Sequence, residues 1–304
     1  MSYFETITDI AAFEGQRSAG AKHINQWKDI PHGSKWSATE LRAARLLVRK
    51  GTNESNHMLP ALRSGFEKGM EDARNQEKIQ DLLEGLDYLD PDLTSTEDCH
   101  RYGTGLRNLW ADLAHYGDID GVDNPGYVVP SSVSKLNAEQ ATVRIASSFI
   151  QTVVWSCPPQ HDTYRGVKPA HLVDFSQLPL ELAARTGTGA KMRATADSQL
   201  ISYRLGGNNV YNRDHMHCPA LDGLPVVTDS ILGQLTCEAL ALRLSLTARA
   251  GEDDRPDEDV FVIAAAGKYM RFLQFKISDA YVSELVAGDG EREMTNFVEL
   301  WATP

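Results

Sequence analysis

The sequence predicts an α/β or α+β protein, in which a helical N-terminal half leads into a C-terminal helix–β-hairpin–helix–strand unit on a mixed sheet. Three observations predict this class. Segments with capping signals and helical periodicity dominate the first half. The run from Val260 to Ala266 is continuously apolar, which is typical of a strand buried on both faces. The run from Tyr269 to Ile277 alternates, as a strand does.

Length and composition set the outer limits of the interpretation. The 304 residues suffice for one large domain or two ordinary ones, and we divide them into a mainly helical region, 1–120, and an α/β region, 121–304, which could also pack as one body. Hydrophobic residues make up 42% and charged residues 24%, so a packed core is expected. The net charge of −12 disfavours general affinity for phosphate backbones, although a local basic patch could override it.

The expected location is intracellular, either cytoplasmic or nuclear, with no membrane association. No apolar run approaches the roughly 18 residues that span a bilayer. The N-terminus lacks the basic and apolar regions of a secretory signal. Four widely spread cysteines with no C-x-x-C pair indicate free thiols in a reducing compartment.

The N-terminal third combines an arm with a predicted helix. Residues 1–33 show little periodicity and predict an irregular arm, whose apolar residues could pack on the body: Ile24, Trp27 and Ile30. Ser37 and Glu40 have the spacing of a capping box, and Gly51 follows as a stop signal, so a helix is predicted between them. On that helix one stripe is cationic: Arg42, Arg45 and Arg49. These side chains could contact nucleic-acid phosphates, or form a solvated face.

The middle of the chain carries weaker signals. Residues 52–100 are charged and helical in pattern, and the Gly, Asp and Pro content of 117–130 indicates a boundary or a long surface loop. Asn137 and Gln140 predict the start of another helix, which must end before Pro158. Residues 160–227 predict short strands, such as 199–204.

The C-terminal quarter is the most regular part of the sequence. Asp229 is a candidate cap for a long amphipathic helix that Gly251 would end. Two strands follow, joined by a two-residue Gly267-Lys268 turn that suits an antiparallel hairpin. A short helix over 279–286 and a last strand over 297–301 complete the predicted order of helix, strand, strand, helix, strand.

This hairpin places polar side chains where they could act together. A carboxylate at the start of one strand lies near residues late on its partner, so Asp257 or Asp259 should approach Gln274. Lys276 should point the same way as Gln274, and Glu238 could lean toward the same edge from the preceding helix. Carboxylate and amide oxygens suit Mg²⁺, and a cation beside it could assist attack by water. We therefore predict a magnesium site here. The alternative is a purely structural hairpin, in which Lys276 points to solvent, Gln274 hydrogen-bonds a neighbour and the aspartates solvate a turn.

These residues resemble the PD-(D/E)XK nuclease-like superfamily. Pro256-Asp257 matches its "PD" element, Gln274-Phe275-Lys276 is similar to its E-x-K element, and Glu238 resembles its helical glutamate. The resemblance covers about the last quarter of the chain. It implies metal-dependent phosphodiester hydrolysis, with the Asp and the Gln on the metal ion and the Lys assisting attack. Gln274 stands where the family usually has Glu, and residues 250–258 leave little room for the strand that usually precedes the Asp.

A different alignment treats the same block as the late half of such a fold. The E-x-K element would then lie upstream, and 160–227 contains none. Under that alignment the chain is a degenerate relative that binds nucleic acid without cleaving it.

Two other stretches contain residues that could carry chemistry. Asp214 to Cys218 concentrates metal-capable side chains, so zinc could bind at His215, His217 and Cys218, although the stretch also suits a polar loop. The Gly-Thr-Gly run within 185–191 lacks the spacing of a phosphate-binding loop and predicts a flexible loop.

Three classes of function stay open from sequence. The first is a nuclease-like domain that acts on nucleic acid or binds it. The second is a non-catalytic interaction or scaffold protein with a protein partner, which the net charge of −12 favours. The third is an enzyme acting on a small molecule through the region of His215 and His217.

Overall fold

The structure is a computed structural model of the whole chain. It describes residues 2–18, 20–49, 59–60, 108–109, 112–113, 138–156, 170–176, 179–196, 199–205, 213–217, 220–221, 227–249, 258–266, 269–287 and 293–303. The predictions for 52–100, for 117–130 and for the boundary at residue 120 fall almost wholly outside this part of the chain. Within it, the mixture of helices and a mixed sheet confirms the predicted fold class.

The elements follow one another in a mixed order. The described helices are α1 (Tyr3–Thr6), α2 (Ile10–Gln16), η1 (Ile24–Gln26), η2 (Gly33–Lys35), α3 (Ala38–Ala43), α7 (Ala138–Ser156), α8 (Asp229–Arg249) and α9 (Asp279–Val286). The described strands are β1 (Leu46–Arg49), β2 (Ala170–Ser176), β3 (Leu180–Arg185), β4 (Lys191–Ala196), β5 (Gln199–Leu205), β6 (Arg213–His217), β7 (Ala220–Leu221), β8 (Asp259–Ala266), β9 (Tyr269–Lys276) and β10 (Val298–Ala302).

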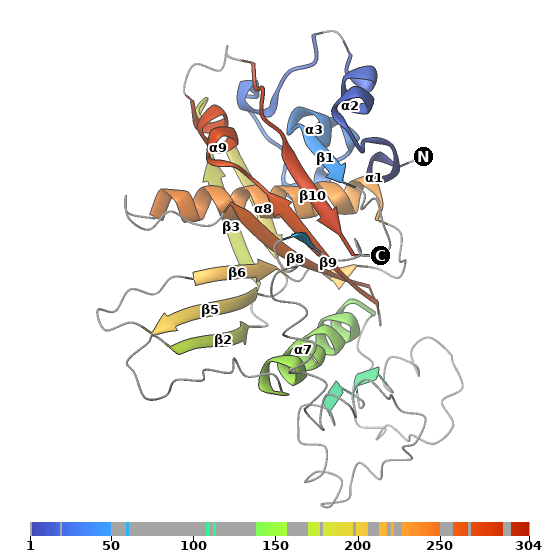
Figure 1. Cartoon of the computed structure of the whole chain (residues 1–304), viewed down its shortest axis with the longest axis vertical. Helices are drawn as coiled ribbons and strands as arrows, with labels where there is room; N and C mark the ends of the chain where they lie inside the picture. Colours follow the sequence, from blue (N-terminus) through green and yellow to red (C-terminus); the bar gives the residue numbers. More distant parts are fainter. Residues whose placement is uncertain are drawn as a thin grey trace, which may run out of the picture.

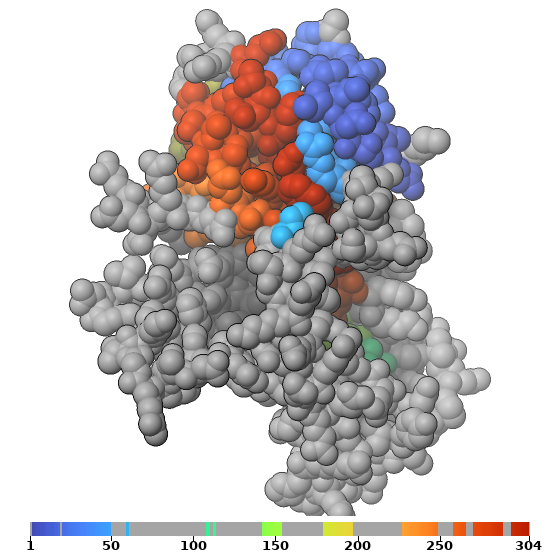
Figure 2. Space-filling view, viewed as in Figure 1, coloured from blue at the N-terminus to red at the C-terminus, as the bar shows by residue number. Residues whose placement is uncertain are grey.

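The main sheet joins the two ends of the chain. Its strand order is β1-β10-β9-β8-β6-β5-β2, and β7 pairs with β8 beside this path. The pairs β1–β10 and β6–β8 are parallel, whereas β10–β9, β9–β8, β6–β5 and β5–β2 are antiparallel. Figure 2 shows the consequence, because the blue N-terminal residues lie directly beside the red C-terminal ones. The N-terminal region is thus part of the C-terminal sheet.

Helix α8 forms the centre of the fold. It crosses the main sheet in Figure 1 and also contacts the separate β3–β4 hairpin, so sheet and hairpin cover it from different sides. The predicted helix is present, but its predicted amphipathic character is wrong, because buried residues follow one another without a break from Leu235 to Leu244. At Gly233 the segment around Trp36 packs so closely that an added Cβ would lie 2.6 Å from the Trp36 Cβ.

The β8–β9 hairpin has the predicted antiparallel pairing. Its last described pair is Ala266 with Tyr269, which leaves the two-residue link between them, itself outside the described residues. Alternate residues belong to different apolar clusters. One face contributes Val262 and Leu273 to the main core around α8, while the other contributes Ile263 to a small cluster under α7. Both faces of β8 are therefore covered, as its apolar run predicts.

The segment after Ser37 departs from the prediction. The capping box of Ser37 and Glu40 is present, but α3 ends at Ala43 and the chain turns into strand β1. Arg45 makes the turn with a positive φ of 54°, a conformation that costs about 1 kcal/mol for a residue other than glycine. Distant residues stabilise the corner, because the hydroxyl of Tyr281 donates to the Ala44 carbonyl at 2.7 Å and that of Tyr3 donates to the Leu46 carbonyl at 2.8 Å.

Other boundaries agree with the sequence or differ in detail. Helix α7 spans the predicted segment and ends before Pro158, α9 has the predicted bounds, and β10 lies one residue later than predicted. The arm forms four short helices, and Ile24 and Ile30 are buried as expected. Asp229 does not cap α8: the Thr228 hydroxyl accepts the Ile231 amide hydrogen, and the Asp229 carboxylate accepts that of Tyr3 at 2.6 Å.

The predicted flexible loop within 185–191 is instead an anchored hairpin turn between β3 and β4. The Gly187 amide donates to the Leu285 carbonyl at 3.0 Å, and the Thr188 hydroxyl donates to the Trp27 carbonyl at 2.9 Å. A Cβ at Gly187 would lie 2.0 Å from the Ala287 carbonyl oxygen, so only glycine fits this close approach to the end of α9.

Candidate functional site

The hairpin brings three of the predicted site residues onto one face of the sheet. Asp259 is paired with Lys276 across the strands, and Gln274 follows on the same face of β9. The Gln274 side-chain amide donates from Nε2 to the Asp259 Oδ1 at 2.8 Å. Gln274 is only 2% exposed, whereas Lys276 is exposed. Asp257, the other predicted carboxylate, lies outside the described residues.

This arrangement does not resemble a formed magnesium site. The Asp259 carboxylate meets the amide nitrogen of Gln274, so the amide oxygen and the carboxylate do not converge on a shared cation. In the described part of the chain no group of three His, Cys, Asp or Glu side chains is close enough to hold a metal ion. Asp259 and Gln274 instead form a hydrogen bond between neighbouring strands.

Glu238 lies on the other side of the sheet from these groups. It is a fully buried residue of α8, the helix that packs on the face containing Val262 and Leu273. Asp259 and Gln274 belong to the opposite face, so the sheet backbone separates them from Glu238. The Glu238 Oε1 accepts a hydrogen bond from Gln234 at 3.1 Å. The expectation that Glu238 leans toward the hairpin site is therefore wrong.

The three arginines predicted to share a stripe have three different environments. Arg45 is buried, with its guanidinium carbon 3.8 Å from the ring centre of Phe297 and its Nε donating to the Asn296 carbonyl at 3.0 Å. Arg49 lies on the sheet and donates from Nε to Glu299 at 2.9 Å. Only Arg42 faces an open pocket. They separate because the chain turns at Arg45 instead of continuing as a helix.

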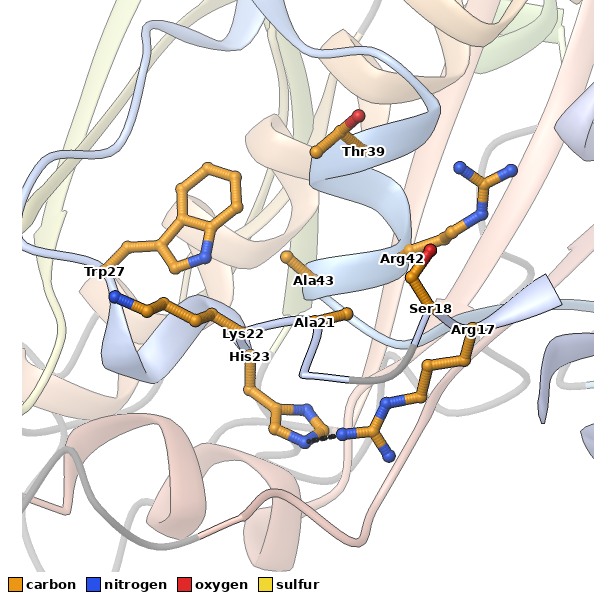
Figure 3. A pocket seen from close by; sticks show the side chains of 9 residues that line it. All are labelled: Arg17, Ser18, Ala21, Lys22, His23, Trp27, Thr39, Arg42 and Ala43. Atoms are coloured by element: carbon orange, nitrogen blue, oxygen red, sulfur yellow. Dashed lines mark hydrogen bonds between the residues drawn. The ribbon is translucent and has the colours of Figure 1, made fainter.

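That pocket is lined by several cationic side chains. It has a volume of about 390 Å³, within the usual range for small-molecule sites. We call it the basic pocket and define it by its lining: Arg17, Ser18, Ala21, Lys22, His23, Trp27, Thr39, Arg42 and Ala43. Three of these side chains are cationic, and none is a carboxylate. Figure 3 shows the cationic groups spread around the pocket, not converging on one point.

Arg17 and His23 form one side of the basic pocket. An Arg17 NH2 group lies 2.8 Å from the His23 Nε2 (Figure 3), and because a guanidinium only donates, Nε2 must accept and His23 is neutral. Burial lowers the pKa of His23, and the guanidinium groups of Arg17 and Arg45 lower it further. Arg17 is 3.9 Å from Glu14 and 3.8 Å from Glu293, long contacts to exposed carboxylates that neutralise little of its charge.

Arg42 forms another side of the basic pocket, and only part of the hydrogen-bonding capacity of its guanidinium is used. Its NH2 group donates to the Gln16 side chain at 3.3 Å, and its guanidinium carbon lies 5.9 Å from the ring centre of Tyr3. Its Nε is buried and makes no hydrogen bond with any residue that the structure describes. Because the hydrogen bond that this guanidinium donates to Gln16 is long, its terminal nitrogens keep the capacity to donate to an anion in the pocket.

The comparisons with known proteins give no family for this chain. No protein-family model matches the sequence, and no curated protein matches it.

The structure bears only in part on two further predictions, a zinc site on β6 and the absence of membrane association. His215 and His217 lie two residues apart on β6, as their spacing predicts, but their side chains and Cys218 fall outside what the structure describes, so the zinc prediction stays a prediction. Among the described helices, none is both long enough and apolar enough to cross a membrane.

Sequence reasoning did not find the basic pocket, although one signal was present. Between Gln16 and Lys35 the chain has four Lys or Arg residues and one acid, in a protein of net charge −12. No periodicity marks these residues, because they lie on short helices and turns that only tertiary packing brings together.

Proposed function

We propose that this protein is a nuclease-like chain that binds a small phosphate-bearing ligand in the basic pocket and does not hydrolyse it. One observation carries the proposal: Arg17, Lys22 and Arg42 line a single pocket whose described lining residues include no carboxylate, on a chain of net charge −12. A local cluster of cations in an acidic protein concentrates anions at that point. Guanidinium groups match the geometry of phosphate oxygens.

The size and charge of the site favour a small ligand over a long nucleic acid. Stable duplex binding usually requires several phosphate contacts along an extended surface. Here Arg45 is buried and Arg49 is paired with Glu299, so the predicted cationic stripe does not exist. A pocket of about 390 Å³ holds one small molecule or one chain end.

The test is a binding measurement with a simple probe. Isothermal titration calorimetry with ribose 5-phosphate should show one site per chain in the wild type. Arg17→Glu, a reversal of charge at a residue that lines the pocket, should weaken binding roughly tenfold.

Lys35→Glu is the matched control, because it changes the net charge equally at an exposed residue outside the pocket. Its affinity should stay close to that of the wild type. No binding by the wild type, or an equal loss in both variants, would refute the proposal.

A second candidate is the metal-dependent nuclease that the sequence resemblance implies. It is supported by the shared face of Asp259, Gln274 and Lys276, with Asp257 two residues upstream. Incubation with single- and double-stranded DNA and RNA in Mg²⁺ or Mn²⁺ tests it, with Lys276→Ala as the control. Cleavage that the variant abolishes would establish this candidate and overturn the binding-only proposal.

A further inference from the structure

Trp27 gives the basic pocket a second kind of binding surface. Its side chain is partly buried against the main core and also lines the pocket. Its backbone is held on two sides, since the amide donates to the Ile24 carbonyl at 3.2 Å and the carbonyl accepts from the Thr188 hydroxyl at 2.9 Å. The indole is therefore attached to an anchored segment, and a planar group could stack on it at little entropic cost.

The polar and aromatic groups occupy different sides of the basic pocket. In Figure 3, Arg17, Ser18 and Arg42 lie on one side, while Trp27 and the end of Lys22 lie on the other. The small side chains of Ala21 and Ala43 lie between them. A lone phosphate could use only one of these sides. A ligand with a phosphate at one end and a flat ring at the other could use both.

We infer that the ligand is a nucleotide with a terminal phosphate, whose base stacks on Trp27 while its phosphate binds on the side of the pocket formed by Arg17, Ser18 and Arg42. This inference rests on the proposed function and names the ligand class of the same site. The hydroxyl of Ser18 supplies a further donor on the phosphate side. The neutral His23 adds no charge there, but it holds the Arg17 guanidinium through the 2.8 Å contact.

The physical basis of the selectivity is stacking added to charge. A base stacked on an aromatic side chain strengthens binding by a factor on the order of five to a hundred, and it does so for any base. Ribose 5-phosphate has the same phosphate and sugar but no base. The difference in affinity between it and a nucleoside monophosphate therefore measures the contribution of the base, and replacing Trp27 shows whether that contribution comes from the indole.

The experiment compares three probes with the full-length chain. Calorimetry with ribose 5-phosphate, adenosine 5′-monophosphate and a 5′-phosphorylated oligoadenylate should give the tightest binding to the two probes that carry a base. The wild type should prefer adenosine 5′-monophosphate to ribose 5-phosphate at least fivefold. Trp27→Ala should reduce that preference to about one, and Trp27→Phe should retain most of it.

The possible results distinguish a failure of the stacking inference from a failure of phosphate binding itself. Equal affinity for adenosine 5′-monophosphate and ribose 5-phosphate in the wild type, or a preference that survives in Trp27→Ala, would overturn the stacking inference but leave phosphate binding intact. No binding of any probe would overturn both. Tighter binding of the oligoadenylate than of the monophosphate would identify a strand end as the source of the nucleotide, and the reverse order a free nucleotide.

Melting curves of both Trp27 variants show whether they are folded. Because the backbone carbonyl of Trp27 accepts the Thr188 hydrogen bond, that anchor persists when the side chain is replaced. An additional readout is the fluorescence of the indole. Adenosine 5′-monophosphate should quench part of the emission of the wild type, and that part should be missing in Trp27→Phe.

Discussion

The basic pocket and the polar end of the β8–β9 hairpin both gather charged and amide side chains, but they differ in how those groups are satisfied. On the hairpin, Gln274 donates to Asp259, and farther along the same sheet Arg49 donates to Glu299. In the basic pocket three cations line one space, and no carboxylate is among the lining residues that the structure describes. Polar groups that bond one another across strands stabilise a sheet, whereas like charges around a cavity favour an anionic ligand.

Regular spacing in the sequence was therefore a poor guide to where cationic side chains line an open pocket. The hairpin residues were easy to find because strand alternation fixes their relative positions, yet their partners are each other. The residues of the basic pocket have no regular spacing, and the contacts that the Arg17 and Arg42 side chains make with polar groups outside the pocket are long. Substitutions should therefore affect stability at the hairpin and affinity at the pocket.

The largest expected effect is at Gln274. Gln274→Ala should lower the free energy of unfolding by about 2–3 kcal/mol, because it removes a buried amide that bonds Asp259 and leaves a cavity. Urea denaturation measures this loss. Lys276→Ala, two residues along the same face but exposed, should change stability by no more than about 0.5 kcal/mol. Equal effects in both variants would contradict a structural role for the amide.

The next largest effect is a difference in ligand affinity between variants of Arg42 and Arg49. Arg42→Gln should weaken the affinity for ribose 5-phosphate roughly tenfold, with little loss of stability, because its only direct hydrogen bond to a described residue is 3.3 Å long. Arg49→Gln changes net charge by the same amount on the sheet, outside the pocket, and should leave affinity unchanged. Calorimetry on both variants decides the matter. If Arg49→Gln weakens binding as much, the phosphate does not bind in the basic pocket.

A smaller effect is expected from pH. The pKa of His23 is lowered in the folded protein by burial and by neighbouring guanidiniums, so the unfolded chain binds its proton first as pH falls. The stabilisation is therefore present above about pH 6.5 and is lost as pH falls below that value. The melting temperature should be lower at pH 5.5 than at pH 7.5.

His23→Gln serves as the control for this measurement, because glutamine can accept the Arg17 hydrogen bond and does not titrate. The variant should show a smaller drop in melting temperature between the two pH values. An unchanged drop would assign the pH dependence to other groups.

The smallest expected effect is at the edge of the sheet. Arg49→Ala removes the ion pair with Glu299, both members of which are partly exposed, so the free energy of unfolding should fall by less than about 1 kcal/mol. The difference from the wild type should shrink further in 1 M salt. A loss that persists in 1 M salt would indicate packing by the arginine stem instead of charge.

Local patterns predicted much of the fold. The C-terminal order of helix, strand, strand, helix, strand is present as predicted. It could be predicted because the residues of each segment alone show the periodicity of a helix or a strand. The helix predicted after Ser37 was wrong at its end for a nonlocal reason. The hydroxyls of Tyr3 and Tyr281, far away in sequence, bond the carbonyls on either side of Arg45 and stabilise a turn that local propensity does not favour.

The residues of the candidate sites also fall into two groups, those that a local pattern placed and those that only tertiary packing placed. The sequence by itself determined that Gln274 and Lys276 share one face, since side chains alternate along a strand. The pairing register in the structure then placed Asp259 on that face, opposite Lys276. Only the tertiary structure decided that Glu238 lies beneath the opposite face, and that Arg17, Lys22, Trp27 and Arg42 surround one pocket. These groups are positioned by packing between short elements, and packing depends on contacts that no local pattern records.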